Sequence, residues 1–214
     1  DSSGASALNN LSDVLIEATS SMYIGNVPSS TDGANYNLGI GVTALDAITE
    51  GDGNIAIGHD ALTANTTGAR NPAIGQNAYD AADEEDDNLA IGYDALGGAV
   101  AGGEKNIAIG NYSLDSNTSG NENIAIGYEA LQTNQTGEKN TAIGFAAMAY
   151  STGDKNTAIG YKAMNINTGG TKNVAVGHVA LYNNTDGQKN TAIGYEALYS
   201  ATGSGNTSLG HWSG

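Results

Sequence analysis

A five-residue string, N-x-A-[IV]-G, recurs along the 214-residue chain, and its regular spacing constrains the fold more than any other feature. Its last glycine falls at Gly58, Gly75, Gly92, Gly110, Gly127, Gly144, Gly160, Gly177 and Gly194, and variant copies end at Gly41 and Gly210. Successive copies are 16 to 18 residues apart. A degenerate first copy, S-M-Y-I-G, ends at Gly25. Such a fixed period predicts a repeat architecture in which each unit packs on the next.

The whole unit reads N-x-A-I-G-Y-x-A-L-x-x-N-T-x-G-x-K. We interpret it as strand, bend, strand and turn, with the N-T-x-G part as the turn in which glycine takes positive φ. Neither short apolar run can bury its side chains alone, so the copies are expected to stack at the inter-strand spacing of about 4.8 Å. The sequence therefore predicts an all-β parallel β-solenoid of about eleven to twelve 17-residue coils.

An asparagine opens every copy of the unit. These residues are Asn37, Asn54, Asn71, Asn88, Asn106, Asn123, Asn140, Asn156, Asn173, Asn190 and Asn206. Stacked side-chain amides can hydrogen-bond from one layer to the next, so we expect a structural asparagine ladder. The rival role for asparagine is glycosylation, because Asn65, Asn117 and Asn134 lie in N-x-[ST] sequences.

The first strand of the unit is apolar on both sides. Its middle position is Ala in nine of eleven copies, and its outer positions are mostly Ile, Val, Leu or Thr. Alternate strand residues face opposite sides, so one row faces the coil interior and the other needs a cover. In a self-stacking rod the natural cover is another copy of the chain, and the sequence predicts a homotrimer about the long axis.

Composition bounds the possible partners. A formal net charge of -16 argues against nucleic acid and anionic membranes as ligands. The chain has no cysteine and no run of 18 apolar residues, so neither a disulfide framework nor membrane insertion is expected. The spacing of Leu8, Leu11 and Leu15 suggests a short helix or docking segment, so residues 1–30 are assigned as an attachment or capping segment and residues 31–214 as the solenoid.

Aromatic residues near the repeat glycine are the candidate ligand contacts. They are Tyr93, Tyr128, Tyr161 and Tyr195, with Phe145 in the same register and Tyr182 and Tyr199 nearby. Amphipathic rings suit sugars and protein receptors, but a purely structural column of rings fits the same pattern and is preferred. A basic residue precedes the repeat Asn in six copies, at Arg70, Lys105, Lys139, Lys155, Lys172 and Lys189. Acidic residues before three of these lysines predict a seam of mixed charge, and a receptor-binding role for the stripe is the secondary interpretation.

No cofactor, metal site or enzymatic activity is expected. His59 and His178 lie seven coils apart and cannot share an ion. The acidic run from Asp83 to Asp87 lacks the spaced pattern of a calcium loop and is interpreted as a solvated corner. A polysaccharide depolymerase would need two carboxylates roughly 5 to 10 Å apart, and no residue pair marks such a site.

The repeat resembles two groups of proteins. N-x-A-I-G is similar to the motif of trimeric autotransporter adhesin heads, and N-T-A-I-G-Y-x-A-L (Asn140, Asn156 and Asn190 open such copies) resembles the repeats of bacteriophage tail-fibre and related virion proteins. The resemblance implies a left-handed homotrimeric β-roll in a virion tail fibre, with fibre proteins and a host cell-surface glycan or protein as partners. The alternative that it implies is an extracellular adhesin head on a bacterial cell surface.

Overall fold

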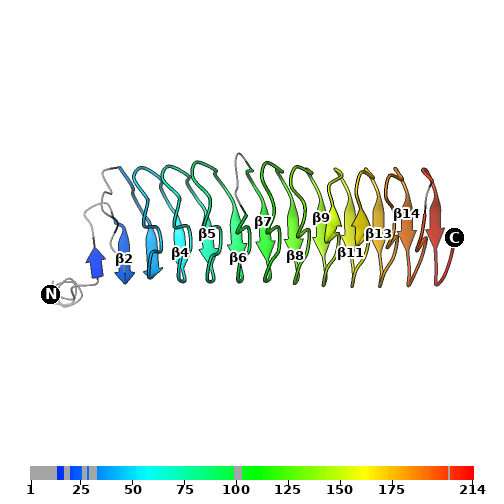
Figure 1. The fold of residues 1–214 in the computed structure, drawn as a ribbon, viewed down its shortest axis with the longest axis horizontal. Helices are drawn as coiled ribbons and strands as arrows, with labels where there is room; N and C mark the ends of the chain where they lie inside the picture. The colour runs from blue at the N-terminus through cyan, green and yellow to red at the C-terminus, as the bar shows by residue number, and fades with distance from the viewer. Residues whose placement is uncertain (1–13, 17–19, 26–27, 29–32, 99–102, 202) are drawn as a thin grey trace.

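The computed structural model describes residues 14–16, 20–25, 28, 33–98, 103–201 and 203–214, which form one straight stack of coils (Figure 1). Its strands are β1 (Val14–Ile16), β2 (Met22–Gly25), β3 (Leu38–Gly41), β4 (Ile55–Ile57), β5 (Pro72–Ile74), β6 (Leu89–Ile91), β7 (Ile107–Ile109), β8 (Ile124–Ile126), β9 (Thr141–Ile143), β10 (Tyr150–Ser151), β11 (Thr157–Ile159), β12 (Ile166–Asn167), β13 (Val174–Val176), β14 (Thr191–Ile193) and β15 (Thr207–Leu209). Thirteen strands form one sheet, and β10 pairs only with β12. From β2 to β15 every pairing is parallel.

The strands stack in the register of the sequence repeat. Ala56 pairs with Ala73 and Ala125 pairs with Ala142, so equivalent residues of successive units lie directly above one another. The eleven strands from β3 to β15, leaving out β10 and β12, bound ten complete turns. β2 continues the stack with Gly25 opposite Gly41, as expected for a degenerate first copy. The predicted parallel β-solenoid is confirmed.

The second half of each unit is not the strand that the sequence suggested. Apart from β10 and β12, this half turns through a series of corners. The positive φ angles also lie elsewhere than predicted: they occur at the second and fourth residues of Y-x-A-L, such as Glu129 (56°) and Leu131 (51°), and before the repeat Asn, as at Lys139 (58°). Left-handed backbone costs a non-glycine residue roughly 1–2 kcal/mol, so burial and inter-coil hydrogen bonds must offset it.

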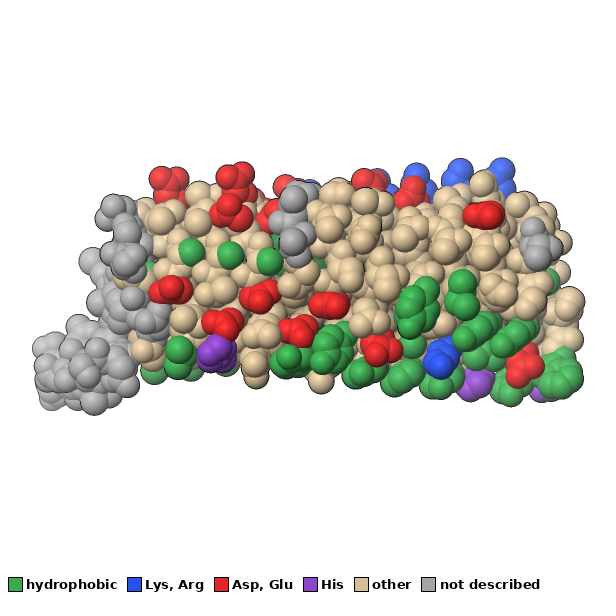
Figure 2. All heavy atoms as spheres, in the orientation of Figure 1, with side chains coloured by type: hydrophobic (Ala, Val, Ile, Leu, Met, Phe, Trp, Pro, Cys, Tyr) green, Lys and Arg blue, Asp and Glu red, His purple; other side chains and the backbone are tan. Residues whose placement is uncertain are grey.

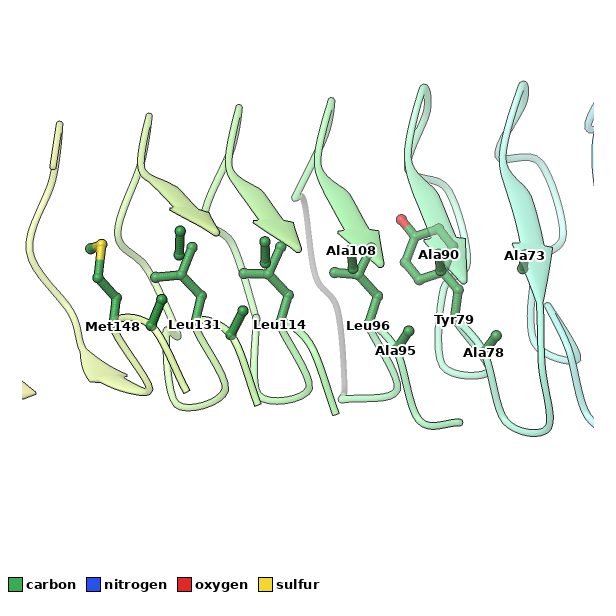
Figure 3. Packing of buried hydrophobic residues seen from close by; sticks show 14 of the residues in the cluster. Ala73, Ala78, Tyr79, Ala90, Ala95, Leu96, Ala108, Leu114, Leu131 and Met148 are labelled. Carbon is green, nitrogen blue, oxygen red and sulfur yellow. The ribbon is translucent and has the colours of Figure 1, made fainter. Parts of the chain in front are cut away.

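The core inside each coil is only three side chains wide. The middle Ala of the strand, the Ala of Y-x-A-L and the Leu after it point toward one another from opposite walls (Figure 3). In the coil of β8 these are Ala125, Ala130 and Leu131, all fully buried. Tyr79, Met148 and Met164 replace the leucine in other coils. The small residue is required because the walls are close, and the leucine row supplies most of the apolar volume.

A continuous asparagine ladder joins the coils. The backbone N–H of each repeat Asn donates to the side-chain oxygen of the repeat Asn one coil earlier, over ten unbroken steps of 2.7–3.0 Å from Asn37 to Asn206. The side-chain nitrogen donates to a turn carbonyl of the same unit, as Asn123 does to Gly137 at 2.8 Å. From Asn37 to Asn190 these residues are buried and both side-chain atoms are satisfied.

A second set of buried asparagines lies in the N-T-x-G turn. Asn65, Asn117 and Asn134 are fully buried, and each donates to the carbonyl of the glycine three residues later at 2.9–3.1 Å. An amide buried in this way is closed to a glycan. The rival glycosylation role is therefore wrong for the folded chain.

The repeat glycine allows two coils to meet backbone to backbone. Gly127 has a φ of 137°, and a Cβ at this position would overlap the carbonyl oxygen of Gly144 in the next coil. Gly210 has a similar φ of 125° but no atom within 4 Å of its would-be Cβ. The positive φ explains why this residue is glycine in all eleven copies. In every copy except the last, the backbone of the next coil also leaves no room for a Cβ.

The first described residues of the N-terminal segment form a strand rather than a helix. Leu15 lies in β1, opposite Tyr23 of β2 in the one antiparallel pair of the large sheet. The helix expected at Leu15 is therefore wrong, and Leu8 and Leu11 lie outside the described residues. The antiparallel pairing covers the backbone edge that β2 would otherwise present to another strand, which limits edge-to-edge association.

Replacing Asn123 by Ala should destabilise the rod by about 1–3 kcal/mol, because it leaves the buried N–H of Asn140 without a partner and removes one of the two donors to the carbonyl of Gly137. Chemical denaturation followed by circular dichroism measures the change. The matched control is Asn183→Ala, at an exposed side chain of the turn region. Equal stability of the two variants would contradict a contribution of the asparagine ladder to the free energy of unfolding.

Replacing Gly127 by Ala should cost more than replacing Gly210 by Ala, although the two glycines share one register and a similar φ. Backbone strain of about 1–3 kcal/mol is common to both changes, whereas only Gly127 faces another coil. Thermal unfolding of both variants separates strain from crowding. Similar losses in both would show that inter-coil contact does not select glycine.

Candidate functional site

The outward face of the sheet carries two parallel rows of side chains. The first and third strand residues point out of the coil, and the middle residue points in. The first row is mostly Ile or Leu from β4 to β8 and Thr in β9, β11, β14 and β15, while the other row is almost wholly Ile. Ile74, Ile159 and Ile193 are 38–39% exposed. Neighbours in the row cover their flanks, so only the outer surface of each isoleucine is open.

A column of aromatic rings runs along one edge of this face. Tyr128, Phe145, Tyr161, His178, Tyr195 and His211 stack at centroid separations of 4.9–5.4 Å and interplanar angles of 10–16°. We call these six residues the ring column; the lower edge of Figure 2 shows hydrophobic and histidine side chains gathered toward the C-terminal end. Tyr128, Phe145 and Tyr161 are each 41–44% exposed. Each ring between the two ends has both faces covered by neighbours, so it offers its edge and polar tip to a ligand.

Acidic neighbours raise the pKa of three exposed phenols, those of Tyr93, Tyr128 and Tyr195. The charge of Glu129 raises the pKa of the Tyr128 hydroxyl, and a hydrogen bond to Glu196 raises that of Tyr195. Asp94 raises the pKa of Tyr93 in the same way, chiefly through its charge. The hydroxyl of Tyr195 is thus already engaged by the carboxylate of Glu196, so these two residues present a joint polar group at the edge.

The remaining predicted tyrosines lie near the ring column but do not all join it. Tyr93 contacts Tyr112 edge to face at 5.4 Å, and Tyr112 contacts Tyr128 at 5.9 Å. Sequence reasoning missed Tyr112 because it stands two residues after the repeat glycine rather than one, behind Asn111. Tyr182 and Tyr199 form a separate stacked pair at 5.1 Å. A ligand-binding role for these residues stays a prediction.

The predicted mixed-charge seam forms only in part. Lys105 pairs with Glu104 at 3.6 Å, and Lys139 lies 3.8 Å from Glu122 and 3.9 Å from Glu138. The carboxylates of Glu104, Glu122 and Glu138 line a shallow recess with these lysines nearby. The recess brings carboxylates of three successive coils together, which the linear sequence did not show.

The acidic corner is organised by Arg70. Its guanidinium pairs with Asp86 at 2.9 Å and with Asp87 at 2.5 Å, and this contact lowers the pKa of Asp87. Glu85 is buried and accepts the backbone N–H of Asp83. Over the described ranges, no three His, Asp or Glu side chains are grouped as a metal site.

The stacked strands, the inward alanines and the asparagine ladder define the chain as a β-solenoid repeat protein. No protein-family model, curated protein or solved structure matches it. Within the described part of the chain, no helix has the length and apolarity that crossing a membrane requires.

Proposed function

We propose that the chain is a structural segment of a bacteriophage tail fibre or spike, a homotrimeric rod that holds and presents a host-binding surface. One observation carries the proposal: the asparagine ladder runs without a break over ten steps, so the repeat makes a stiff straight spacer. The resemblance of its N-T-A-I-G-Y-x-A-L units to tail-fibre repeats supports this use.

Trimer formation would cover the outward face of the sheet. Side chains there are already flanked by their neighbours, so covering one isoleucine adds roughly 1 kcal/mol rather than the full gain of burying an exposed residue. Repeated over ten turns, this still amounts to about 10 kcal/mol, enough to compete with the cost of association. Three copies around the axis would bury this face and leave the charged corners in solvent.

A bacterial surface adhesin head is the alternative role. It uses the same rod and trimer and differs only in where the rod is anchored. Its support is the resemblance of the N-x-A-I-G string to adhesin-head repeats.

Replacing both Ile126 and Ile143 by Asp should dissociate the trimer, because two coils would place six charges at its apolar contact. Sedimentation equilibrium at micromolar concentration measures the mass. Gln135→Asp with Gln188→Asp is the matched control, since these exposed glutamines lie in turns. A folded monomer of the unmodified chain would refute the trimer.

Immunogold electron microscopy with antibodies against the chain tests its location. We expect label on thin fibres of virus particles from the source of the sequence. Label on the envelope of uninfected bacterial cells would favour the adhesin instead. Label on neither particles nor cells would contradict both roles.

A further inference from the structure

Charge is distributed very unevenly along the rod. Residues 1–139 contain 20 acidic and three basic residues, whereas residues 140–214 contain three acidic and four basic residues. Figure 2 shows the change along the upper edge, where acidic side chains dominate the N-terminal half and basic side chains the C-terminal end. The overall charge of -16 therefore comes from the N-terminal part, and the C-terminal part carries slightly more basic than acidic residues.

That surface is made by the position directly before the repeat Asn. From Arg70 to Lys139 the charge at this position alternates from coil to coil, in the order Arg70, Asp87, Lys105, Glu122 and Lys139. Basic residues here contact acidic ones, as in the pairs of Arg70 with Asp87 and Lys139 with Glu122. The alternation then stops, and Lys155, Lys172 and Lys189 follow in three successive coils. We call these three residues the lysine row.

The backbone holds the lysine row in line. The N–H of Lys172 donates to the carbonyl of Asp154 at 3.1 Å, and that of Lys189 donates to Thr171 at 3.0 Å. All three lysines share a φ of 57–60°. Their Cα atoms are thereby repeated at the coil spacing of about 4.8 Å, and the three exposed side chains start from equivalent positions.

Asp154 directly precedes Lys155, but the amines of the row form no ion pair among the described residues. No ion pair within 4.0 Å involves its three amines, and the residues before Lys172 and Lys189 are the uncharged Thr171 and Gln188. The acidic run near Asp87 lies four coils from Lys155, or about 19 Å, which exceeds the screening length of about 8 Å in physiological salt. An approaching anion therefore meets three amines that no ion pair holds, with Glu138 and Asp154 as the carboxylates nearest to Lys155 in the stack.

We propose that the lysine row binds a linear acidic polysaccharide, an inference that names a ligand class for the attachment surface and rests on that proposed function. A polymer with carboxylate or sulfate groups on successive sugars can place anions beside successive amines without bending. The exposed side chain of Gln188 supplies further hydrogen-bonding atoms at the same edge. Lysine suits such repeated single-point contacts, since it acts as a compact charge rather than a planar fork.

Two other occupants fit less well. Single-stranded nucleic acid needs aromatic platforms for its bases, but the ring column lies on the other edge of the rod (Figure 2). A second copy of the chain could offer Asp87 and Glu122, the acidic residues at the same position of the coil, but both already pair with basic residues. The polysaccharide is thus the occupant that the neighbours of the row favour.

The test compares two double variants of the full chain. Lys172→Gln with Lys189→Gln removes two charges from the row, and Lys105→Gln with Lys162→Gln removes two charges outside it. All four positions have φ between 50° and 60°, so the backbone demand is matched. Binding of polygalacturonate and dextran sulfate is measured by biolayer interferometry, with neutral dextran and an oligo(dT) strand as comparisons, and circular dichroism confirms folding.

We expect both acidic polymers to bind and neutral dextran not to bind. The row variant should lose about tenfold in affinity and the control variant less than twofold, and binding should weaken as salt rises. Three results would overturn the inference: no binding by the unmodified chain at low salt, equal losses in both variants, or tighter binding of oligo(dT). If antibodies against the chain label virus fibres but the chain binds no acidic polymer, the proposed ligand is refuted and the proposed structural role stands.

Discussion

The hydrogen bond from the backbone N–H of one repeat Asn to the side chain of the Asn one coil earlier is the contact on which the rest of the rod depends. It fixes the height and the rotation of each coil relative to its neighbour at one buried point. Every other repeated feature then falls into a straight line parallel to the axis. Equivalent aromatic, apolar and charged side chains line up because the ladder keeps successive coils in register. The register holds even where the coil length changes from 17 to 16 or 18 residues.

Stability in this architecture is collected between coils rather than inside them. A core of Ala, Ala and Leu buries little apolar volume for each unit of 17 residues. Several residues also sit in left-handed backbone, which opposes folding. Backbone bonds, the asparagine ladder and glycine contacts all join one unit to the next, so an isolated coil lacks most of the contacts that hold it. The cooperativity of the rod follows from this nearest-neighbour arrangement.

Much of the fold was predictable because the repeat states it many times. The period of the repeat predicted the coil, and Asn123 and its equivalents predicted the ladder. The alternation of Ala125 with its neighbours in the strand predicted a row of side chains that faces the interior. The corners were not predictable, because Leu131 and Lys139 adopt left-handed backbone for tertiary reasons that local propensity does not contain. Tyr112 was missed for a related reason, since its ring contacts Tyr128 at the end of the ring column from an irregular register. Leu15 followed a helical spacing in sequence but pairs with an existing strand edge.

The direction of the inter-coil hydrogen bonds gives the rod an unusual response to mechanical load. These bonds lie along the axis, so a pull on the two ends stretches them directly and separates one coil from the next in turn. Each coil that opens replaces about 4.8 Å of rod by roughly 55 Å of extended chain. A rod with this bond direction therefore carries a reserve of length that a pull along its axis would release coil by coil.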